Sequence, residues 1–239
     1  MAPLEVIGAG LSHTCSSSFR DALNMLGYNT FHGMELLDHL DIDLSVFYDS
    51  YYFPEKQVDW DKVYDGYNAA LDLPTAAFVG PLMKKYPNAK VLLVERDFES
   101  WYESAKTTMY WALCLTDPTS LGPHKLKLRA FYKSELILEG MFKDQETFLD
   151  KDKVRAIYER HNAWIKENVP SEKLLIMDME EGWNRMCQFL GKPVPEAPFP
   201  HTDTSKDFIA TMKSRGLNDV PAPASSSSAS EKNEGGLVA

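Results

Sequence analysis

Cysteine and long apolar runs are scarce in this sequence. Its three cysteines, Cys15, Cys114 and Cys187, are odd in number and lack the spacing of metal ligands, which argues against a disulfide framework and a zinc site. The longest apolar stretch, residues 75–83, has roughly half of the ~20 residues that a transmembrane helix needs. The first residues include Glu5, where a signal peptide would carry basic side chains. We therefore expect a cytoplasmic protein that binds no metal and does not enter a membrane.

Basic residues are outnumbered as well. The 239 residues include 25 Lys and Arg against 35 Asp and Glu, so the formal charge is -10. A chain of that charge repels the phosphate backbone of nucleic acids and anionic membrane surfaces. Nucleic acid is therefore not an expected partner, and an anionic ligand would need local basic groups or a helix N-terminus.

The apolar segments that are present alternate with helical patterns. Residues 4–7, 90–94 and 173–177 are short apolar runs that predict strands, and the spacing of apolar residues predicts helices between them. Strands joined through helices form parallel sheets that are covered on both faces. We expect one three-layer α/β/α domain over residues 1–219, with a mostly parallel central sheet. The Pro-, Ser- and Gly-rich residues 220–239 predict a disordered tail.

Several predicted helices are rich in Tyr, Phe, Trp and Met. They include residues 60–71, 77–85 and 124–142. Open α/β sheets bind ligands at the carboxyl ends of their strands. We expect these segments to form a helical cap over that edge, although any single aromatic residue could equally belong to the core.

A loop of small and hydroxyl-bearing residues follows the first predicted strand. Residues 8–18 read Gly-Ala-Gly-Leu-Ser-His-Thr-Cys-Ser-Ser-Ser and lead into a predicted helix. Backbone N–H groups at such a junction favour an anion such as a phosphate. The loop has no lysine, which argues against ATP hydrolysis, and it lacks the third glycine of a dinucleotide fingerprint.

A series of short motifs then runs along about residues 4 to 203. They are Phe31-His32-Gly33-Met34-Glu35, Asp59-Trp60-Asp61, Gly66-Tyr67, Asp72-Leu73-Pro74, Tyr86-Pro87-Asn88-Ala89-Lys90-Val91, Arg96-Asp97, Trp101-Tyr102-Glu103-Ser104, Tyr158, Arg160-His161-Asn162, Glu181-Gly182-Trp183, Phe189-Leu190-Gly191 and Pro198-Phe199-Pro200. With the opening Val-Ile-Gly-Ala-Gly-Leu, their order and spacing resemble a branch of the P-loop sulfotransferase family. In that branch the loop reads approximately Gly-Arg-Thr-Gly-Thr-x-Ser-Leu.

The resemblance implies a nucleotide site. In that family the loop holds the 5'-phosphosulfate of 3'-phosphoadenosine 5'-phosphosulfate, which here assigns the donor to the loop residues Ser12, Thr14, Cys15, Ser16 and Ser17. Arg96 and Ser104 match the positions that hold the 3'-phosphate. An Arg fork and a hydroxyl on the first turns of a helix can reach one phosphate, but Arg96 could instead pair with Asp97 or Glu99.

Several positions of the loop depart from the family pattern, and Ser16, Ser17, Ser18 and Phe19 end the motif. His13 stands in place of the arginine and Cys15 in place of a glycine. In sulfuryl transfer, the oxygen that joins the sulfuryl group to the 5'-phosphate gains negative charge as the bond breaks. A permanently charged side chain stabilises this oxygen, and a histidine does so only partly at neutral pH. A side chain at position 15 also fills space where the backbone would approach a phosphate closely.

The candidate catalytic residues are His32 and His13. Transfer to a hydroxyl needs a base, and His32, which is followed by Glu35, is the first candidate. His13 becomes available as an acid or base if no phosphosulfate binds.

Two enzyme functions therefore stay open, together with a non-catalytic binding role. One is transfer of a sulfuryl group to the hydroxyl of a small apolar metabolite of secondary metabolism. The other is donor-free acid/base chemistry on such a metabolite, namely dehydration, isomerisation or cyclisation, in which His13 and His32 act together.

Overall fold

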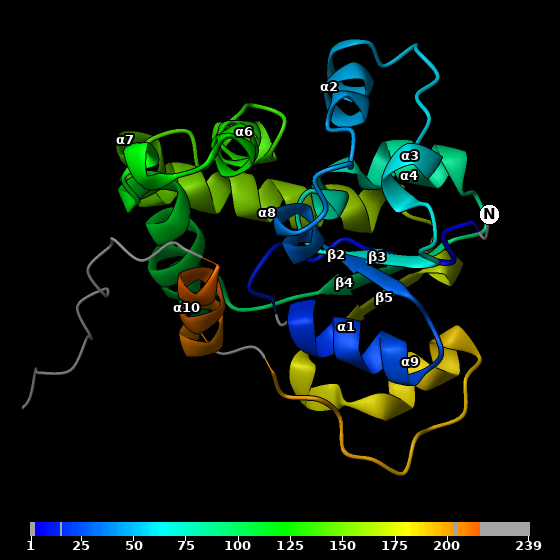
Figure 1. The fold of residues 1–239 in the computed structure, drawn as a ribbon. Coiled ribbons are helices and arrows are strands. Elements are labelled where there is room, and N and C mark those ends of the chain that lie inside the picture. Colours follow the sequence, from blue (N-terminus) through cyan, green and yellow to red (C-terminus); the bar gives the residue numbers. More distant parts are fainter. Residues whose placement is uncertain (1–2, 15, 203–204, 216–239) are drawn as a thin grey trace, which may run out of the picture.

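The computed structural model describes residues 3–14, 16–202 and 205–215. Five parallel strands form one sheet in the order β2-β3-β1-β4-β5. They are β1 (Val6–Gly8), β2 (Thr30–His32), β3 (Ala69–Leu71), β4 (Lys90–Val94) and β5 (Leu174–Met177). Helices pack on both faces of this sheet (Figure 1), which confirms the predicted three-layer α/β/α fold. The tail predicted at residues 220–239 lies outside the described residues, so the domain boundary stays a prediction.

Alternate residues of the strands divide the core into two layers. Helices α1 (Ser16–Met25) and α9 (Trp183–Leu190) cover one face, where they pack against the side of β1 that carries Val6. The opposite face, which carries Ile7, is covered by a larger cluster that includes α8 (Lys151–Asn168). This period of two explains why the strands read as continuous apolar runs, because both of their faces are buried.

The other described elements complete the two layers and the cap. The α-helices are α2 (Ser45–Tyr52), α3 (Asp61–Tyr64), α4 (Val79–Lys85), α5 (Phe98–Ala105), α6 (Pro123–Tyr132), α7 (Gln145–Leu149) and α10 (Ser205–Ser214). The short helical turns are η1 (Gly33–Leu37), η2 (Thr75–Phe78), η4 (Pro118–Ser120), η5 (Leu138–Gly140), η6 (Ser171–Lys173) and η7 (Met179–Glu181), and η3 (Lys106–Leu115) is a π-helix that continues α5.

A cap of helices stands off the carboxyl ends of the strands. It consists of η3, α6 and α10, and Figure 1 shows α6 and α10 on the side toward which β4 runs. Helix α10 is fixed to the cap by Met212, which packs with Trp111 and Ala112 of η3. The C-terminal part of the described chain thus returns to the edge of the sheet where the β1 loop lies.

Two helices predicted from the sequence are wrong in their second halves. The segment 60–71 is helical in α3 and then becomes β3, because Ala69 and Ala70 pair with neighbouring strands on both sides. That non-local pairing overrides the helix propensity of alanine. The segment 124–142 ends as α6 at Tyr132, and the positive φ angles from Leu138 to Gly140, between 49° and 72°, prevent a continuous helix.

Candidate functional site

A cavity of about 300 Å³ lies at the carboxyl edge of the sheet. The ends of four neighbouring strands each contribute to its wall, through Ser12 after β1, His32 at the end of β2, Asp72 after β3 and Arg96 after β4. Parallel strands bring these positions to one edge, which is where α/β folds bind ligands. The volume is at the lower end of the roughly 300–1,000 Å³ typical of small-molecule sites.

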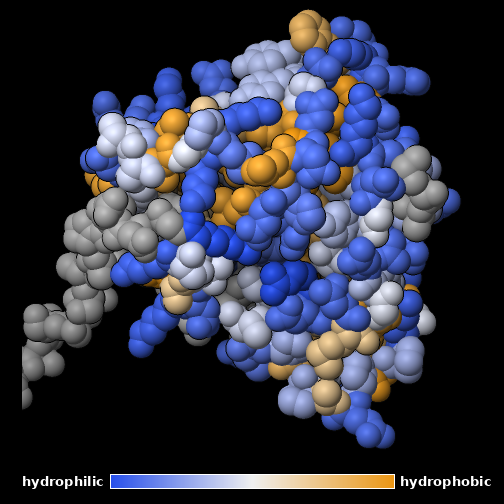
Figure 2. Space-filling view, in the orientation of Figure 1, coloured by the Kyte–Doolittle hydropathy of each residue, from blue (hydrophilic) through white to orange (hydrophobic). Residues whose placement is uncertain are grey.

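The cap and η1 together give the cavity a largely apolar wall. Met34 and Leu37 of η1, Leu128 of α6 and Phe208 and Met212 of α10 are part of it. Figure 2 shows apolar residues gathered on this face of the molecule and surrounded by polar ones. The site therefore favours a ligand with an apolar body and a small number of polar groups.

The floor of the cavity is the part formed where the strands end, and Asp72 is its polar centre. It is 8% exposed and has a φ of 71°, in the left-handed region, directly after β3. Its Oδ1 accepts a short hydrogen bond from the Ser12 hydroxyl, and its Oδ2 lies 3.5 Å from Nε2 of His32. Asp tolerates this backbone better than most residues, and the turn directs its carboxylate to the loop after β1 and the end of β2.

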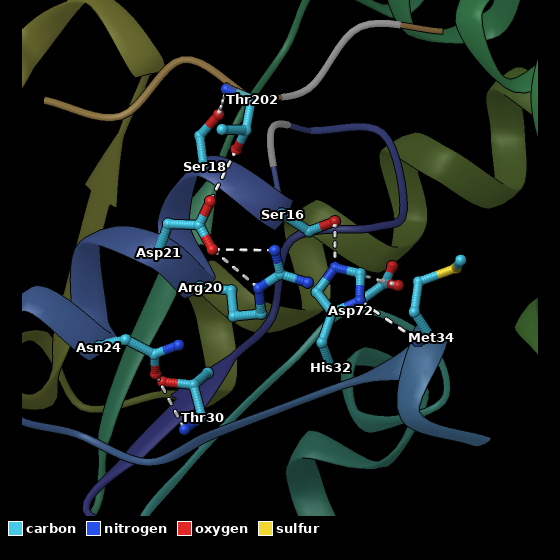
Figure 3. A network of polar contacts seen from close by, with 10 residues as sticks. All are labelled: Ser16, Ser18, Arg20, Asp21, Asn24, Thr30, His32, Met34, Asp72 and Thr202. Carbon is cyan, nitrogen blue, oxygen red and sulfur yellow. Dashed lines mark hydrogen bonds and ion pairs between the residues drawn. The ribbon is translucent and has the colours of Figure 1, made fainter. Parts of the chain in front are cut away.

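His32 is held in one tautomer by its neighbours. The Met34 N–H donates to Nδ1 at 3.3 Å, so a neutral ring carries its proton on Nε2. That nitrogen lies 3.0 Å from the Ser16 hydroxyl and is directed toward Asp72 (Figure 3). An imidazolium would place a second N–H against the Met34 N–H. The geometry therefore makes His32 a hydrogen-bond donor to its neighbours, whereas a base would need Nε2 without its proton.

This cluster differs from a nucleophilic Ser-His-Asp triad. In such a triad the serine and the carboxylate bind opposite nitrogens of the imidazole. Here Ser16 and Asp72 both lie at Nε2 of His32, and a backbone N–H occupies Nδ1. Proton relay from Ser16 through the ring to Asp72 is therefore not built into the site.

The β1 loop is held by contacts from β4 and α5. The Arg96 guanidinium donates from Nη1 to the carbonyl oxygen of His13 at 2.9 Å, and the Trp101 indole donates to the carbonyl of Ser12 at 2.9 Å. The His13 ring packs edge-on against Phe208 of α10, with ring centroids 5.1 Å apart. Arg96 does not form the ion pairs with Asp97 or Glu99 that the sequence left open as alternatives; it holds the loop instead.

The predicted donor-site residues do not all face the cavity. Ser12, Ser16, Ser17, Arg96 and Ser104 line it, together with both candidate histidines. Thr14 is buried elsewhere and donates its hydroxyl to the carbonyl of Leu11 at 2.7 Å. Cys15 lies outside the described residues.

The wall is positively charged although the whole chain is negative. Five basic residues line the cavity against three acidic ones, which gives a formal charge of +2 with neutral histidines. The basic residues are Arg20, Arg96, Lys125, Arg129 and Arg215, and the acidic ones are Asp21, Asp72 and Asp207. Each of the five basic side chains already contacts a carbonyl or carboxylate of the protein.

Two of the titratable groups near the site have displaced pKa values. Loss of hydration, followed by the charge of nearby Asp72, raises the pKa of Tyr132 well above its ordinary value, and its hydroxyl donates to the carbonyl of Leu73 at 3.0 Å. Burial lowers the pKa of His161, whose Nε2 donates to the carbonyl of Ala9 at 2.7 Å. His161 is thus a neutral support beneath the loop.

Sequence reasoning did not assign a role to Asp72 or to α10. Asp72 belongs to the motif Asp72-Leu73-Pro74 of the sequence. Its position directly after strand β3 could not be predicted, because the residues of β3 were predicted to be helical. The contribution of α10 rests on contacts between residues almost 200 positions apart, such as His13 with Phe208. The one sequence feature that could have indicated a functional Asp72 is a carboxylate followed by Leu73-Pro74. The sequence has no comparable feature that would have indicated that α10 contributes to the site.

Comparisons with known proteins agree with this architecture. The model of the sulfotransferase domain family matches residues 5–208. A protein of Aspergillus versicolor described as "Ava biosynthesis cluster protein M" is 28% identical over 221 residues, which cover 88% of this chain and 85% of that protein. Among the described residues, no helix is long and apolar enough to cross a membrane, and no three acidic, His or Cys side chains are grouped as metal ligands.

Proposed function

The chain belongs to the sulfotransferase domain family, and from that premise we propose that it is an enzyme of small-molecule biosynthesis which acts by acid/base chemistry at Asp72 without a sulfuryl donor. The apolar cavity supports a small apolar substrate. The name of the Aspergillus relative, a biosynthesis cluster protein, supports a role in secondary metabolism.

The observation that carries this proposal is the direct contact between the loop and the polar floor. Ser12 bonds Asp72, and Ser16 lies 3.0 Å from His32. In a transfer reaction the migrating group must lie between the donor loop and the base that activates the acceptor. Here the side chains of loop and floor already meet, so the residues present fit a phosphosulfate poorly.

The charges in the loop point the same way. His13 occupies the position of the family's arginine, and its ring packs against Phe208. Arg96 is engaged with the His13 carbonyl oxygen. The described loop residues 8–14 and 16–18 therefore include no permanent cation that could stabilise the bridging oxygen of the donor as it gains negative charge during sulfuryl transfer.

The chemistry that the floor supports is proton transfer. Both oxygens of Asp72 face hydrogen-bond donors, and the carboxylate lies in the cavity wall, where a general base would reach a bound substrate. It would take a proton from a carbon beside a substrate carbonyl and return it to another atom of the same molecule. The carbonyl oxygen, which gains the electron pair, would accept hydrogen bonds from Ser16 or His32. Unlike dehydration and cyclisation, isomerisation requires no catalytic group other than this base and these hydrogen-bond donors.

Sulfuryl transfer from 3'-phosphoadenosine 5'-phosphosulfate is the second candidate. Arg96 and Ser104, the positions that the family uses for the 3'-phosphate, line the same cavity. The positive charge of the wall is also compatible with an anionic donor. A substrate hydroxyl near Asp72 would then be the acceptor.

Metabolite profiling of a strain that lacks the gene distinguishes the two candidates. The compound that accumulates is compared by mass with the compound that disappears. Equal masses indicate isomerisation or cyclisation, and loss of water indicates dehydration, so both outcomes support the proposal. A product heavier by one SO₃ overturns it.

Calorimetry with 3'-phosphoadenosine 5'-phosphate provides a test on the purified protein. We expect no binding by the wild type. The variant His13→Arg/Cys15→Gly, which restores the arginine and one glycine of the family loop, is the matched control, and gain of binding in this variant would locate the loss of the donor in those two positions. Micromolar binding by the wild type that disappears in Arg96→Ala would favour the second candidate.

A further inference from the structure

Three basic side chains gather at one end of the cavity, under the cap. Lys125 and Arg129 extend from α6, and Arg215 follows the last turn of α10. The Lys125 ammonium donates to the Arg215 carbonyl oxygen, which joins the two helices and places a cation at the C-terminus of α10. Arg129 donates from Nε to the carbonyl of Leu113 at 2.8 Å. This end, called the basic end below, is thus defined by Lys125, Arg129 and Arg215.

Arg215 has an unused donor there. Its Nη2 lies 2.6 Å from the carboxylate of Asp38. Its Nη1 is buried and, among the described residues, has no hydrogen-bond partner. A buried donor of a charged group is costly when it is left unpaired, and a ligand that accepts a hydrogen bond at this position would remove that cost.

Other charges around the basic end do not supply the missing acceptor. Asp38 is held by Nη2 of Arg215. Asp207 also lines the cavity, but it lies in the first turn of α10, eight residues before Arg215 and therefore ~12 Å away along the helix.

Helix α6 connects the basic end with the region of Asp72. Lys125, Arg129 and Tyr132 follow one face of α6 at helical spacing, and Tyr132 bonds the carbonyl of Leu73, next to Asp72. Seven residues separate Lys125 from Tyr132, which is ~10 Å along the helix axis. Leu128 lies between them in the cavity wall, so the two polar regions are separated by an apolar surface.

We infer that the basic end binds the carboxylate of an amphiphilic substrate whose apolar body lies along α6 and whose reacting atoms reach Asp72. The inference rests on the proposed function only for the statement that the bound molecule is the substrate. A guanidinium presents a planar pair of donors that matches a carboxylate. Nη1 of Arg215 supplies the open position, and the largely apolar wall of the cavity of about 300 Å³ favours a monocarboxylic acid over a nucleotide.

Calorimetric titration of the full chain with octanoate, octan-1-ol and octyl phosphate tests the inference. These probes share one apolar chain and differ in their head group. We expect octanoate to bind about tenfold or more tightly than octan-1-ol, the ratio expected for one charge-assisted hydrogen bond. Equal affinities, no detectable binding of octanoate, or a clear preference for octyl phosphate would overturn it.

Two variants separate recognition of the head group from a structural effect. Arg215→Met keeps much of the side-chain volume, and we expect it to abolish the preference for octanoate while octan-1-ol binds as before. Asp38→Asn is the matched control, because it removes the same ion pair but keeps the guanidinium, and the preference should remain. Equal loss of both ligands in Arg215→Met would show that Arg215 supports the cap and does not bind the head group.

The inference and the proposed function can fail separately. Asp72→Asn should lose turnover but keep the preference for octanoate, because Asp72 lies away from the basic end. If the preference is absent while metabolite profiling still shows an isomerisation, the carboxylate site is wrong and the reaction stands. If the preference is present and the product carries an added SO₃, the site stands and the reaction is wrong.

Discussion

The variant Gly33→Ala tests the arrangement of His32 and Asp72 without knowledge of the substrate. A Cβ at position 33 would lie 2.0 Å from the carbonyl oxygen of Leu73, 2.8 Å from Oδ2 of Asp72 and 3.2 Å from the carbonyl carbon of Leu73. Two of these three atoms are backbone atoms, which cannot rotate aside. The start of η1 must therefore move away from the end of β3 when any side chain is introduced.

The cost of that movement can be estimated from overpacking in well-packed interiors. Such substitutions cost about 1–3 kcal/mol of unfolding free energy, and a chain of this length loses ~2–4 °C in melting temperature for each kcal/mol. The movement also separates Nε2 of His32 from Oδ2 of Asp72, which are 3.5 Å apart. We expect lower stability and, once the substrate is known, a loss of turnover.

Urea unfolding followed by tryptophan fluorescence measures the effect. Gly122→Ala is the matched control, because Gly122 has an ordinary φ of -67° and a Cβ added there would meet no heavy atom within 4 Å. Because Gly122 is the N-cap of α6, where glycine is preferred to alanine, this control should lower the unfolding free energy by about 1 kcal/mol or less, through the cap alone. If Gly33→Ala is as stable as Gly122→Ala, the close approach of η1 to Leu73 is wrong, and with it the geometry of the polar floor.

Two further predictions concern Asp72 and His161. Asp72→Asn should change stability by about 1 kcal/mol or less, since Asn tolerates the left-handed backbone and its amide can pair with both Ser12 and His32, while turnover of the identified substrate falls by ~100-fold or more. The lowered pKa of His161 means that the folded protein binds fewer protons than the unfolded chain; its contribution to stability is complete above pH 6.5 and is lost as the pH falls below that value. His161→Gln, which can still donate to the Ala9 carbonyl oxygen, should therefore lose less stability than the wild type between about pH 7.5 and about pH 5.5; equal losses in urea midpoints would refute this.

The fold could be predicted where the local pattern and the long-range structure agree. Strand β4, Lys90–Val94, has the same bounds in the sequence prediction and in the structure, and four of its five residues are apolar. The three-residue strands β2 and β3 were missed because so short a segment carries little periodicity, and the pairing of β2 with β3 and of β3 with β1 is non-local. These two short strands are thus determined by the strands they pair with more than by their own residues.

The site was predicted in part for the same reason. The loop after β1 could be placed from its small residues and the helix that follows, and Ser12, His13, Ser16 and His32 do line one cavity. The tautomer of His32 could not be predicted, because it depends on one backbone N–H of Met34. The sequence prediction that His32 and His13 act as an acid/base pair remains untested, and the contacts of the two rings instead favour Asp72 as the base.

The changes in the loop and the position of Asp72 can be explained together. A loop that binds a phosphosulfate must keep its donors directed at the anion, and its side chains must leave room for the transferred group. When the arginine of the family pattern is replaced by His13, the anion loses a permanent cation, and the hydroxyls of Ser12 and Ser16 become available for other partners. In this chain those partners are Asp72 and His32, which the ends of β3 and β2 bring to the same point. In the proposed function, the loop that faces the acceptor in the family pattern is part of the proton-transfer site, and its hydroxyls supply hydrogen-bond donors there.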